Sequence, residues 1–143
     1  MLKYFFSCLL ITNLTIGQVG PQTQLPSHAR LLMLKNEERV IQNNINSDKT
    51  WTVMHQSILA ECDSLENVPP VEHIKIGRRL LDKSRECLRR VFYLSYAWRM
   101  THKEKYLKRA EKELLAVSAF SDWNPTHFLD VAEMTLSVSI GYD

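Results

Sequence analysis

Two consecutive helical patterns joined by a very short turn constrain the fold of this chain most. Apolar residues recur at three- and four-residue spacing over residues 79–100 and again over residues 103–120. Only the polar turn 101–103 separates the two patterns, so these helices must pack antiparallel as an αα-hairpin. We therefore expect an all-α protein built from antiparallel helical hairpins.

Three further helices are expected around this hairpin. Residues 35–45 show the helical period, and Glu37 and Glu38 lie in the first turn, where the helix dipole favours acidic side chains. A second helix begins after a capping Ser47 or Asp48 and runs to residue 65. A last helix is expected over residues 128–140. No later helix is expected that could cover its apolar side, which consists of Val131, Met134, Leu136, Val138 and Ile140.

The same periodicity predicts which residues of the other helices face the core. The second helix turns Trp51, Met54, His55, Ile58, Leu59, Cys62 and Leu65 inward. The longest helix contributes Leu81, Leu88, Val91, Ser95 and Trp98, and its hairpin partner contributes Tyr106, Leu107, Ala110, Leu114, Val117 and Ala119. Lysine and glutamate side chains of the hairpin partner are expected to face solvent.

Composition and charge exclude several classes of protein. The 143 residues suffice for one ordinary domain, and 45% hydrophobic content with four glycines excludes collagen-like and broadly disordered chains. The basic residues Arg78, Arg79, Arg85, Arg89 and Arg90 lie at helical spacing from Asp82 and Glu86. This pattern and a formal charge of +2 favour a solvated, ion-paired face, so no nucleic-acid partner is expected.

The first residues have the pattern of a secretory signal. Lys3 precedes a largely apolar run over residues 4–16, and we expect cleavage after Gly17. Residues 18–27 then form a polar linker that contains Pro21 and Pro26. The apolar run is too short for a span of about 20 residues. We therefore expect a secreted or periplasmic protein with no stable membrane span.

Two cysteines, Cys62 and Cys87, remain after this cleavage. Each lies among apolar positions of a predicted helix, which favours buried free thiols, with a disulfide as the alternative in an oxidising compartment. No CxxC or HExxH spacing occurs. His127, Asp130 and Glu133 recur every third position and spread around the helix, so we expect no metal site and no cofactor.

The loop over residues 119–130 is the candidate binding site. Pro125 ends the incoming helix and allows the next to begin near Thr126. Loops held by a rigid scaffold carry function more often than the helices they join. Trp123, Asn124 and His127 are therefore the candidate ligand-binding residues.

A purely structural interpretation of the same loop stays open. In that interpretation Trp123 closes the end of the hairpin and Asp122 or Thr126 caps the next helix. His127 would then be an ordinary polar residue on the surface.

Several segments occur in an order that matches one known family. They are Ser27-His-Ala-Arg-Leu-Leu32, Tyr93-Leu-Ser-Tyr-Ala-Trp-Arg-Met-Thr101, Lys105-Tyr-Leu-Lys-Arg-Ala110, Asp122-Trp-Asn-Pro-Thr-His-Phe-Leu-Asp130, Ala132-Glu-Met134 and Ile140-Gly-Tyr-Asp143. Together they resemble the heparinase II/III-like polysaccharide lyases over about residues 27–143. Ala29 departs from the pattern, because the family usually has proline after that histidine.

The resemblance implies that residues 28–143 are the amino-terminal portion of an incomplete (α/α) toroid. The whole bacterial enzyme would cleave uronate-containing polysaccharides, heparin-, heparan- or alginate-like, by β-elimination. In the family the proton-transfer and carboxylate-neutralising residues lie in later helices and a β-sheet domain. No catalytic role is therefore assigned here, Tyr142 and His127 included. Trp123, Asn124 and His127 would line the sugar cleft and contact an acidic polysaccharide.

Two further expectations complete the sequence analysis. We expect this 143-residue chain to be an inactive, truncated fragment that self-associates through the exposed side of its last helix. The alternative, from another functional class, is a helical-repeat module that binds a protein partner.

Overall fold

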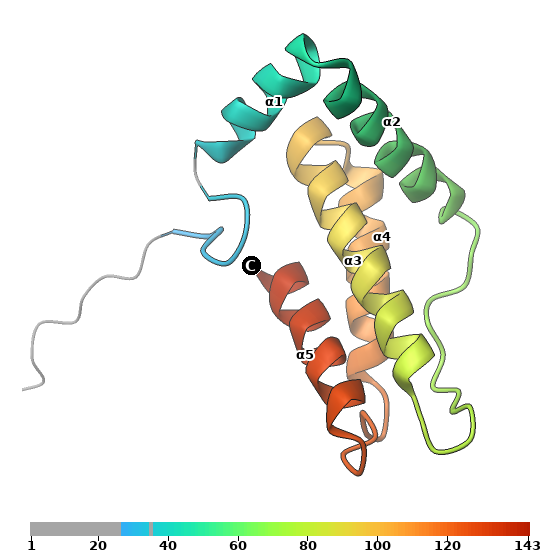
Figure 1. The fold of residues 1–143 in the computed structure, drawn as a ribbon. Coiled ribbons are helices and arrows are strands. Elements are labelled where there is room, and N and C mark those ends of the chain that lie inside the picture. Colours follow the sequence, from blue (N-terminus) through green and yellow to red (C-terminus); the bar gives the residue numbers. More distant parts are fainter. Residues whose placement is uncertain (1–26, 35) are drawn as a thin grey trace, which may run out of the picture.

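Five α-helices form the computed structural model, which describes residues 27–34 and 36–143 (Figure 1). They are α1 (Glu37–Ser47), α2 (Lys49–Ser64), α3 (Leu81–Thr101), α4 (Glu104–Ser118) and α5 (Phe128–Tyr142). The all-α prediction is therefore confirmed. The predicted signal segment 1–17 and the linker up to residue 26 lie outside the described residues. Within the described part, none of the helices has the length and apolar character needed to cross a membrane.

The longest helix, α3, is the element against which the others pack. Helix α4 returns beside it as an antiparallel hairpin, α5 lies along another side, and α1 and α2 arch over one end (Figure 1). His102 ends α3 in the left-handed conformation with φ 54°, and its N–H donates to the Trp98 carbonyl over 2.7 Å. This closure lets the chain reverse direction within the short turn that the sequence predicted.

Helix α2 begins where a cap was predicted. The Asp48 carboxylate accepts hydrogen bonds from the backbone N–H groups of Thr50, at 2.7 Å, and Trp51, at 3.3 Å. Of the two predicted caps, Asp48 is therefore the one used, and Ser47 is the last residue of α1. The cap satisfies backbone donors that no carbonyl within the helix can reach.

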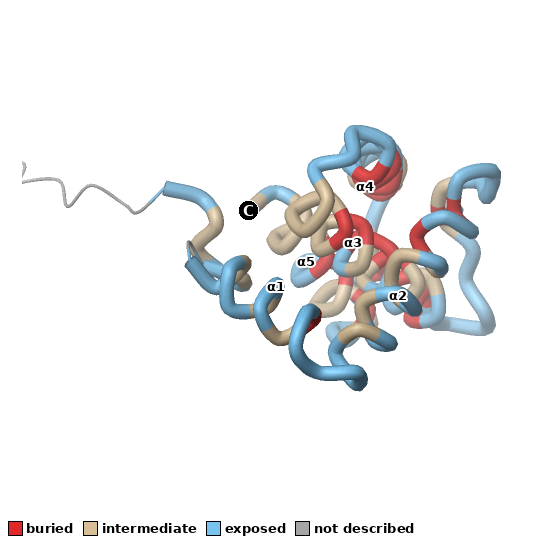
Figure 2. Tube along the Cα trace, turned by 90° about the horizontal axis from the view of Figure 1, so that it is seen from above, coloured by how far each residue is buried: buried red, intermediate tan, exposed pale blue. Residues whose placement is uncertain are grey.

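Two clusters of buried side chains run along α3. One, from α2, α3, α4 and the residue after α2, contains Cys62, Leu65, Leu94, Ala97, Tyr106 and Ala110. The other, from α3, α4, α5 and the segment before α3, contains Val71, Leu80, Cys87, Val91, Val117 and Met134. Figure 2 shows these buried stretches along α3 and the facing side of α4.

The two cysteines lie in different clusters, and both are buried and free, as predicted. Burial raises the pKa of the Cys62 thiol to about 12 and that of Cys87 to about 11. Both thiols therefore stay protonated at neutral pH and behave as small apolar side chains that fill the core.

A buried ionic cluster joins α3 to α4. The Glu113 side chain is 0% exposed, and one carboxylate oxygen accepts from Arg90 Nη1 and Arg109 Nη2, each over 2.7 Å. The other oxygen accepts from the backbone N–H of Val71 over 2.8 Å. Burial would lower the pKa of Arg90, but Glu113 and Glu86 raise it above its ordinary value. The arginine therefore stays charged inside the fold.

The same arginines hold the non-helical segment that follows α2. Arg90 Nη1 donates to the Pro69 carbonyl over 2.7 Å. Arg109 donates through Nε to the Leu65 carbonyl, at 2.9 Å, and through Nη2 to Val68, at 3.1 Å. The arginines thereby hold this segment, which is not helical, against α3 and α4 through its backbone carbonyl groups.

The ionic cluster corrects the predicted faces of the hairpin. Glu113 of α4 is buried, although glutamates there were expected outside, and Arg90 of α3 is buried rather than solvated. Arg109 of α4, for which no side was predicted, is buried as well. Mutual neutralisation makes this burial tolerable. Leu107, which is 44% exposed, and Ala119 do not face the core as predicted.

Other predicted faces also need correction. Trp51 and Met54 of α2 are 41% and 57% exposed, because α1 and α3 cover only part of that helix. In α5, Met134 is fully buried and Val138 packs against the same cluster, so the predicted unpartnered face is partly wrong. The open side of α5 instead presents Phe128, Leu129, Leu136 and Tyr142. Along α3, Leu88, Ser95 and Trp98 are only half-buried.

Removing the charge of Glu113 should destabilise the fold strongly. Glu113→Gln leaves two buried arginines short of a counter-charge, and we expect the free energy of unfolding to fall by about 3–5 kcal/mol. Urea unfolding followed by circular dichroism measures this loss. The control Glu111→Gln changes an exposed residue of the same helix and should stay within ~0.5 kcal/mol of wild type. Equal losses in both variants would contradict the role given to Glu113.

Candidate functional site

The loop predicted to bind a ligand lies between α4 and α5. Trp123 is half-buried against the cluster of α3, α4 and α5. Its indole N–H donates to the Val117 carbonyl near the end of α4 over 2.8 Å. Both the ring and its one polar hydrogen therefore make contacts within the fold, as the structural interpretation of this residue requires.

Asn124 is the one buried residue between α4 and α5. It is 3% exposed and takes the left-handed conformation with φ 59°. Its side-chain amide donates to the Arg78 carbonyl, at 2.8 Å, and to the Asp130 carboxylate, at 2.6 Å. Its backbone N–H donates to Asp122 over 2.7 Å. Since an asparagine amide has two hydrogens, no donor of this side chain is left for a ligand.

The side chains of His127 and Asn124 both lie close to the carboxylate of Asp130. The His127 N–H donates to the Asn124 carbonyl over 2.8 Å, and its Nδ1 lies 3.4 Å from Asp130 Oδ1. Burial would raise the pKa of Asp130, but hydrogen bonds from Asn124 and from the Leu80 N–H, with the charges of His127 and Arg79, lower it. Asp130 therefore stays ionised and anchors the loop to the start of α3.

No side chain caps α5 in the way the structural interpretation proposed. His127 is the N-cap residue and makes no side-chain capping bond. The Asp122 carboxylate instead accepts from the Asn124 N–H within the loop. Thr126 donates to the Asn124 side-chain oxygen over 3.3 Å. The structure thus brings Asn124 and His127 together around Asp130, and a sugar-binding role for them or Trp123 stays a prediction.

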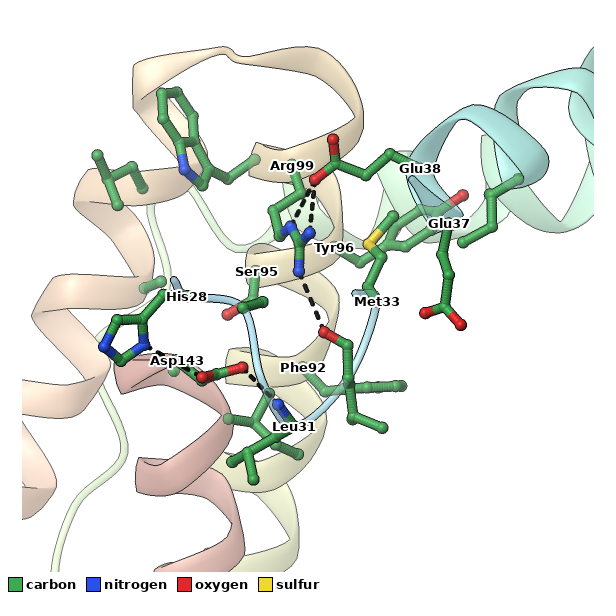
Figure 3. Close-up of a pocket in the computed structure, with 18 of the residues that line it drawn as sticks. His28, Leu31, Met33, Glu37, Glu38, Phe92, Ser95, Tyr96, Arg99 and Asp143 are labelled. Carbon is green, nitrogen blue, oxygen red and sulfur yellow. Dashed lines mark hydrogen bonds and ion pairs between the residues drawn. The ribbon is translucent and has the colours of Figure 1, made fainter. Parts of the chain in front are cut away.

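A larger hollow lies at the opposite end of α5. This groove has a volume of about 970 Å³ and is walled by the segment before α1, by α1, the start of α2, α3, the first half of α4 and the end of α5 (Figure 3). Its aromatic lining consists of His28, Trp51, Phe92, Tyr96, Trp98, His102 and Tyr142. Trp51 and Phe92 are 41% and 44% exposed and Tyr142 is 79% exposed, so these rings present open faces.

Asp143 builds one wall of the groove by binding the segment before α1. Its carboxylate accepts from the backbone N–H groups of Arg30, at 2.6 Å, and Leu31, at 2.8 Å. His28 Nδ1 lies 3.1 Å from its other oxygen (Figure 3). The bond from Leu31 is the largest cause of a lowered pKa at Asp143, so the carboxylate stays charged. These contacts join residues 112 to 115 positions apart.

Arg99 fixes a second wall. Its Nε and Nη2 bind the Glu38 carboxylate of α1, at 2.8 and 2.6 Å, and its Nη1 donates to the Leu32 carbonyl over 3.1 Å (Figure 3). One side chain of α3 therefore ties both α1 and the preceding segment in place. A guanidinium has five N–H donors, so Arg99 keeps two for another partner.

A tyrosine–histidine pair lies at the edge of the groove. The hydroxyl of Tyr96, which lines the groove, is 2.9 Å from Nδ1 of His55 on α2. Burial raises the pKa of Tyr96 and lowers that of His55, so both side chains are neutral at pH 7. The neutral pair holds the phenol ring in a fixed direction through one hydrogen bond.

The arrangement suits a ligand that has apolar faces and polar edges. The indole N–H groups of Trp51 and Trp98 and the Ser95 hydroxyl have no hydrogen-bond partner among the described residues, and all three line the groove. Flat rings bury apolar surface, and unused donors beside them fix orientation. No group of three or more histidine, cysteine or acidic residues gathers as a metal site in the described part.

Sequence reasoning missed the groove for a definable reason. Trp51 and Trp98 were assigned to the core by their helical spacing, which does not record how far a neighbouring helix covers them. The only available signal was the apolar segment over residues 28–34 ahead of the first helix.

No protein-family model matches the sequence, and it matches no curated protein.

The buried role of Asn124 can be tested by two substitutions. Asn124→Gly keeps the left-handed conformation but loses both amide bonds, and we expect the free energy of unfolding to fall by about 2–3 kcal/mol. Asn124→Ala should lose a further ~1–2 kcal/mol, because its Cβ opposes the left-handed conformation. Chemical denaturation measures both losses. Ser121→Ala, at an exposed position of the same loop, should match wild type. Wild-type stability in both Asn124 variants would contradict this role.

Proposed function

We propose that the chain is the amino-terminal part of the helical domain of a secreted polysaccharide lyase and that its groove binds an acidic polysaccharide. The resemblance over about residues 27–143 supports the enzyme class. The all-α fold, with α3 and α4 as an antiparallel hairpin, is compatible with part of an (α/α) toroid. No catalytic residue is assigned to the described part, so the proposed role of this region is to bind substrate.

The observation that carries the proposal is the set of open aromatic faces around one groove. Trp51, Phe92 and Tyr142 line it, and these residues are between 41% and 79% exposed to solvent. The C–H face of a sugar ring buries apolar surface against such rings, and the hydroxyl groups of the sugar can bond to donors beside them. The groove therefore satisfies the apolar and polar requirements of a saccharide at once.

One cationic side chain among the lining residues, Arg99, can pair with the carboxylate of a uronate, and Glu37, Glu38 and Asp143 line the same groove. Arg99 retains two donors after binding Glu38 and Leu32. Guanidinium groups bind carboxylates with paired, charge-assisted hydrogen bonds. We therefore assign carboxylate recognition to Arg99.

Substitution of one aromatic residue at each place should show whether the polysaccharide binds in the groove or at the loop. In the full chain, Trp51→Ala should weaken the binding of heparan-type or alginate-type oligosaccharides about tenfold, because it removes one stacking face. Isothermal titration calorimetry measures the dissociation constant, and a neutral oligosaccharide of equal length should bind more weakly. Trp123→Phe tests the loop: unchanged affinity favours the groove, whereas a loss in this variant alone would assign binding to Trp123 and its neighbours.

A protein-binding helical module is the second candidate, and the open side of α5 favours it. Phe128 is 84% exposed and Leu136 49% exposed, on a helix without a basic residue. Exposed apolar patches of this kind occur at sites of protein association. A second copy of the chain is the simplest partner for such a side.

Self-association through α5 has its own test. Leu136→Glu places a charge on the apolar side and should shift the sedimentation profile from a concentration-dependent dimer toward monomer, with at least a tenfold weaker association. Gln56→Glu, at an exposed position of α2 away from α5, adds the same charge outside that side and should leave association nearly unchanged. A wild-type chain that stays monomeric at all concentrations would reject this partner.

A further inference from the structure

The groove beside α1 is lined by more negative than positive side chains. Three carboxylates, Glu37, Glu38 and Asp143, and one guanidinium, Arg99, line it. Arg99 already pairs with Glu38. The carboxylate of Asp143 is engaged by His28 and by two backbone N–H groups of the segment before α1. The surplus negative charge of the groove therefore lies at Glu37.

Glu37 is held in position and still has a free acceptor. Its Oε2 accepts from the backbone N–H of Leu34 over 2.7 Å. Within residues 27–34 and 36–143, its Oε1 has no hydrogen-bond partner and its carboxylate forms no ion pair. Glu37 also lies in the first turn of α1, where the helix dipole favours an acidic side chain. A positioned carboxylate oxygen is therefore available to a donor on a ligand.

The aromatic rings of the groove favour a positively charged donor. Phe92 and Trp51 line the groove together with Glu37, and these two aromatic residues are 44% and 41% exposed. Figure 3 shows Phe92 and Glu37 among the side chains of the groove. The face of an aromatic ring carries partial negative charge and attracts cations. A carboxylate that shares a groove with open rings is suited to an ammonium group.

A uronate polysaccharide supplies such a cation when the sugar next to the uronate is a hexosamine with an unsubstituted amine. N-acetylation of that amine removes the charge, and N-sulfonation makes it negative. Arg99, to which we assigned the uronate carboxylate, pairs with Glu38, the residue next to Glu37 in α1. Arg99 and Glu37 therefore belong to one wall of the groove, and neighbouring sugars of one chain can contact both.

We propose that the groove selects a uronate polysaccharide whose neighbouring sugar carries a free, protonated amine, and that Glu37 is the residue that selects it. This selection rests on the proposed binding of a uronate chain in the groove. The ammonium group donates to Glu37 Oε1 and lies against an open ring, while the uronate carboxylate pairs with Arg99. An N-sulfonated chain binds most weakly, because its sulfate meets the Glu37 carboxylate as a like charge.

Calorimetric titration of the full chain with three tetrasaccharides tests the selection. All three alternate glucuronate with glucosamine and differ only at the nitrogen, which is a free amine, N-acetylated or N-sulfonated. At about pH 6.5 a free amine of this kind is mostly protonated. We expect the free amine to bind about tenfold more tightly than the N-acetyl form, and the N-sulfo form to bind most weakly.

The possible failures of this titration are distinct. Equal affinity for the three tetrasaccharides, or tightest binding of the N-sulfo form, rejects the selection and leaves the groove as a uronate site. If none of the three binds, the groove is not a polysaccharide site and the selection is rejected with it.

A matched pair of variants assigns the selection to one residue. Glu37→Gln keeps an acceptor for the Leu34 N–H and removes the charge, so the advantage of the free amine should fall to about twofold or less while the N-acetyl form binds as before. The control Glu72→Gln removes the same charge at an exposed position that does not line the groove and should keep the full advantage. Circular dichroism checks that both variants are folded. An advantage that survives in Glu37→Gln, or that is lost equally in both variants, overturns the role given to Glu37.

Discussion

The buried carboxylate of Glu113 is the interaction on which the rest of the arrangement depends. It balances Arg90 and Arg109 where α3 and α4 pack together, and those arginines donate to the carbonyls of the segment after α2. Pro69 and Pro70 prevent that segment from forming a helix, so its carbonyls need external donors. The ionic cluster, together with apolar packing, therefore holds the end of α2 and the segment after it against α3 and α4.

The shape of the groove depends on this ionic cluster and on two contacts between distant parts of the chain. Helices α1 and α2 arch over the end of α3 (Figure 1). Arg99 ties α1 to α3 through Glu38, and Asp143 binds the segment before α1 to the end of α5. Each contact is a charge-assisted bond of a side chain in a fixed position, which orders the aromatic residues around a space without filling it.

Periodicity predicted the helices because burial of an apolar face follows local spacing, and capping chemistry predicted Asp48 as the start of α2. The burial of Glu113 escaped the same reasoning, since its neutralising partner Arg90 comes from another helix. The polar loop was recognised from Pro125, but residue type alone does not distinguish an asparagine that binds a ligand from one whose amide is already used. A local sequence pattern cannot predict that the Asp143 carboxylate forms hydrogen bonds with residues more than a hundred positions away.

The two ends of α5 illustrate a physical criterion for locating a binding surface. At the first end, Asn124 has both amide hydrogens bonded inside the fold and Trp123 donates its N–H to Val117, so a ligand would have to replace bonds that already exist. At the second end, open rings and unused donors such as Trp51 lie around about 970 Å³ of space. A ligand at the first end would have to break hydrogen bonds within the protein, whereas a ligand at the second end would displace water. Trp123, the aromatic residue that the sequence brought forward, makes its contacts within the fold, whereas Trp51, which was assigned to the core, is the residue that we propose to face the ligand.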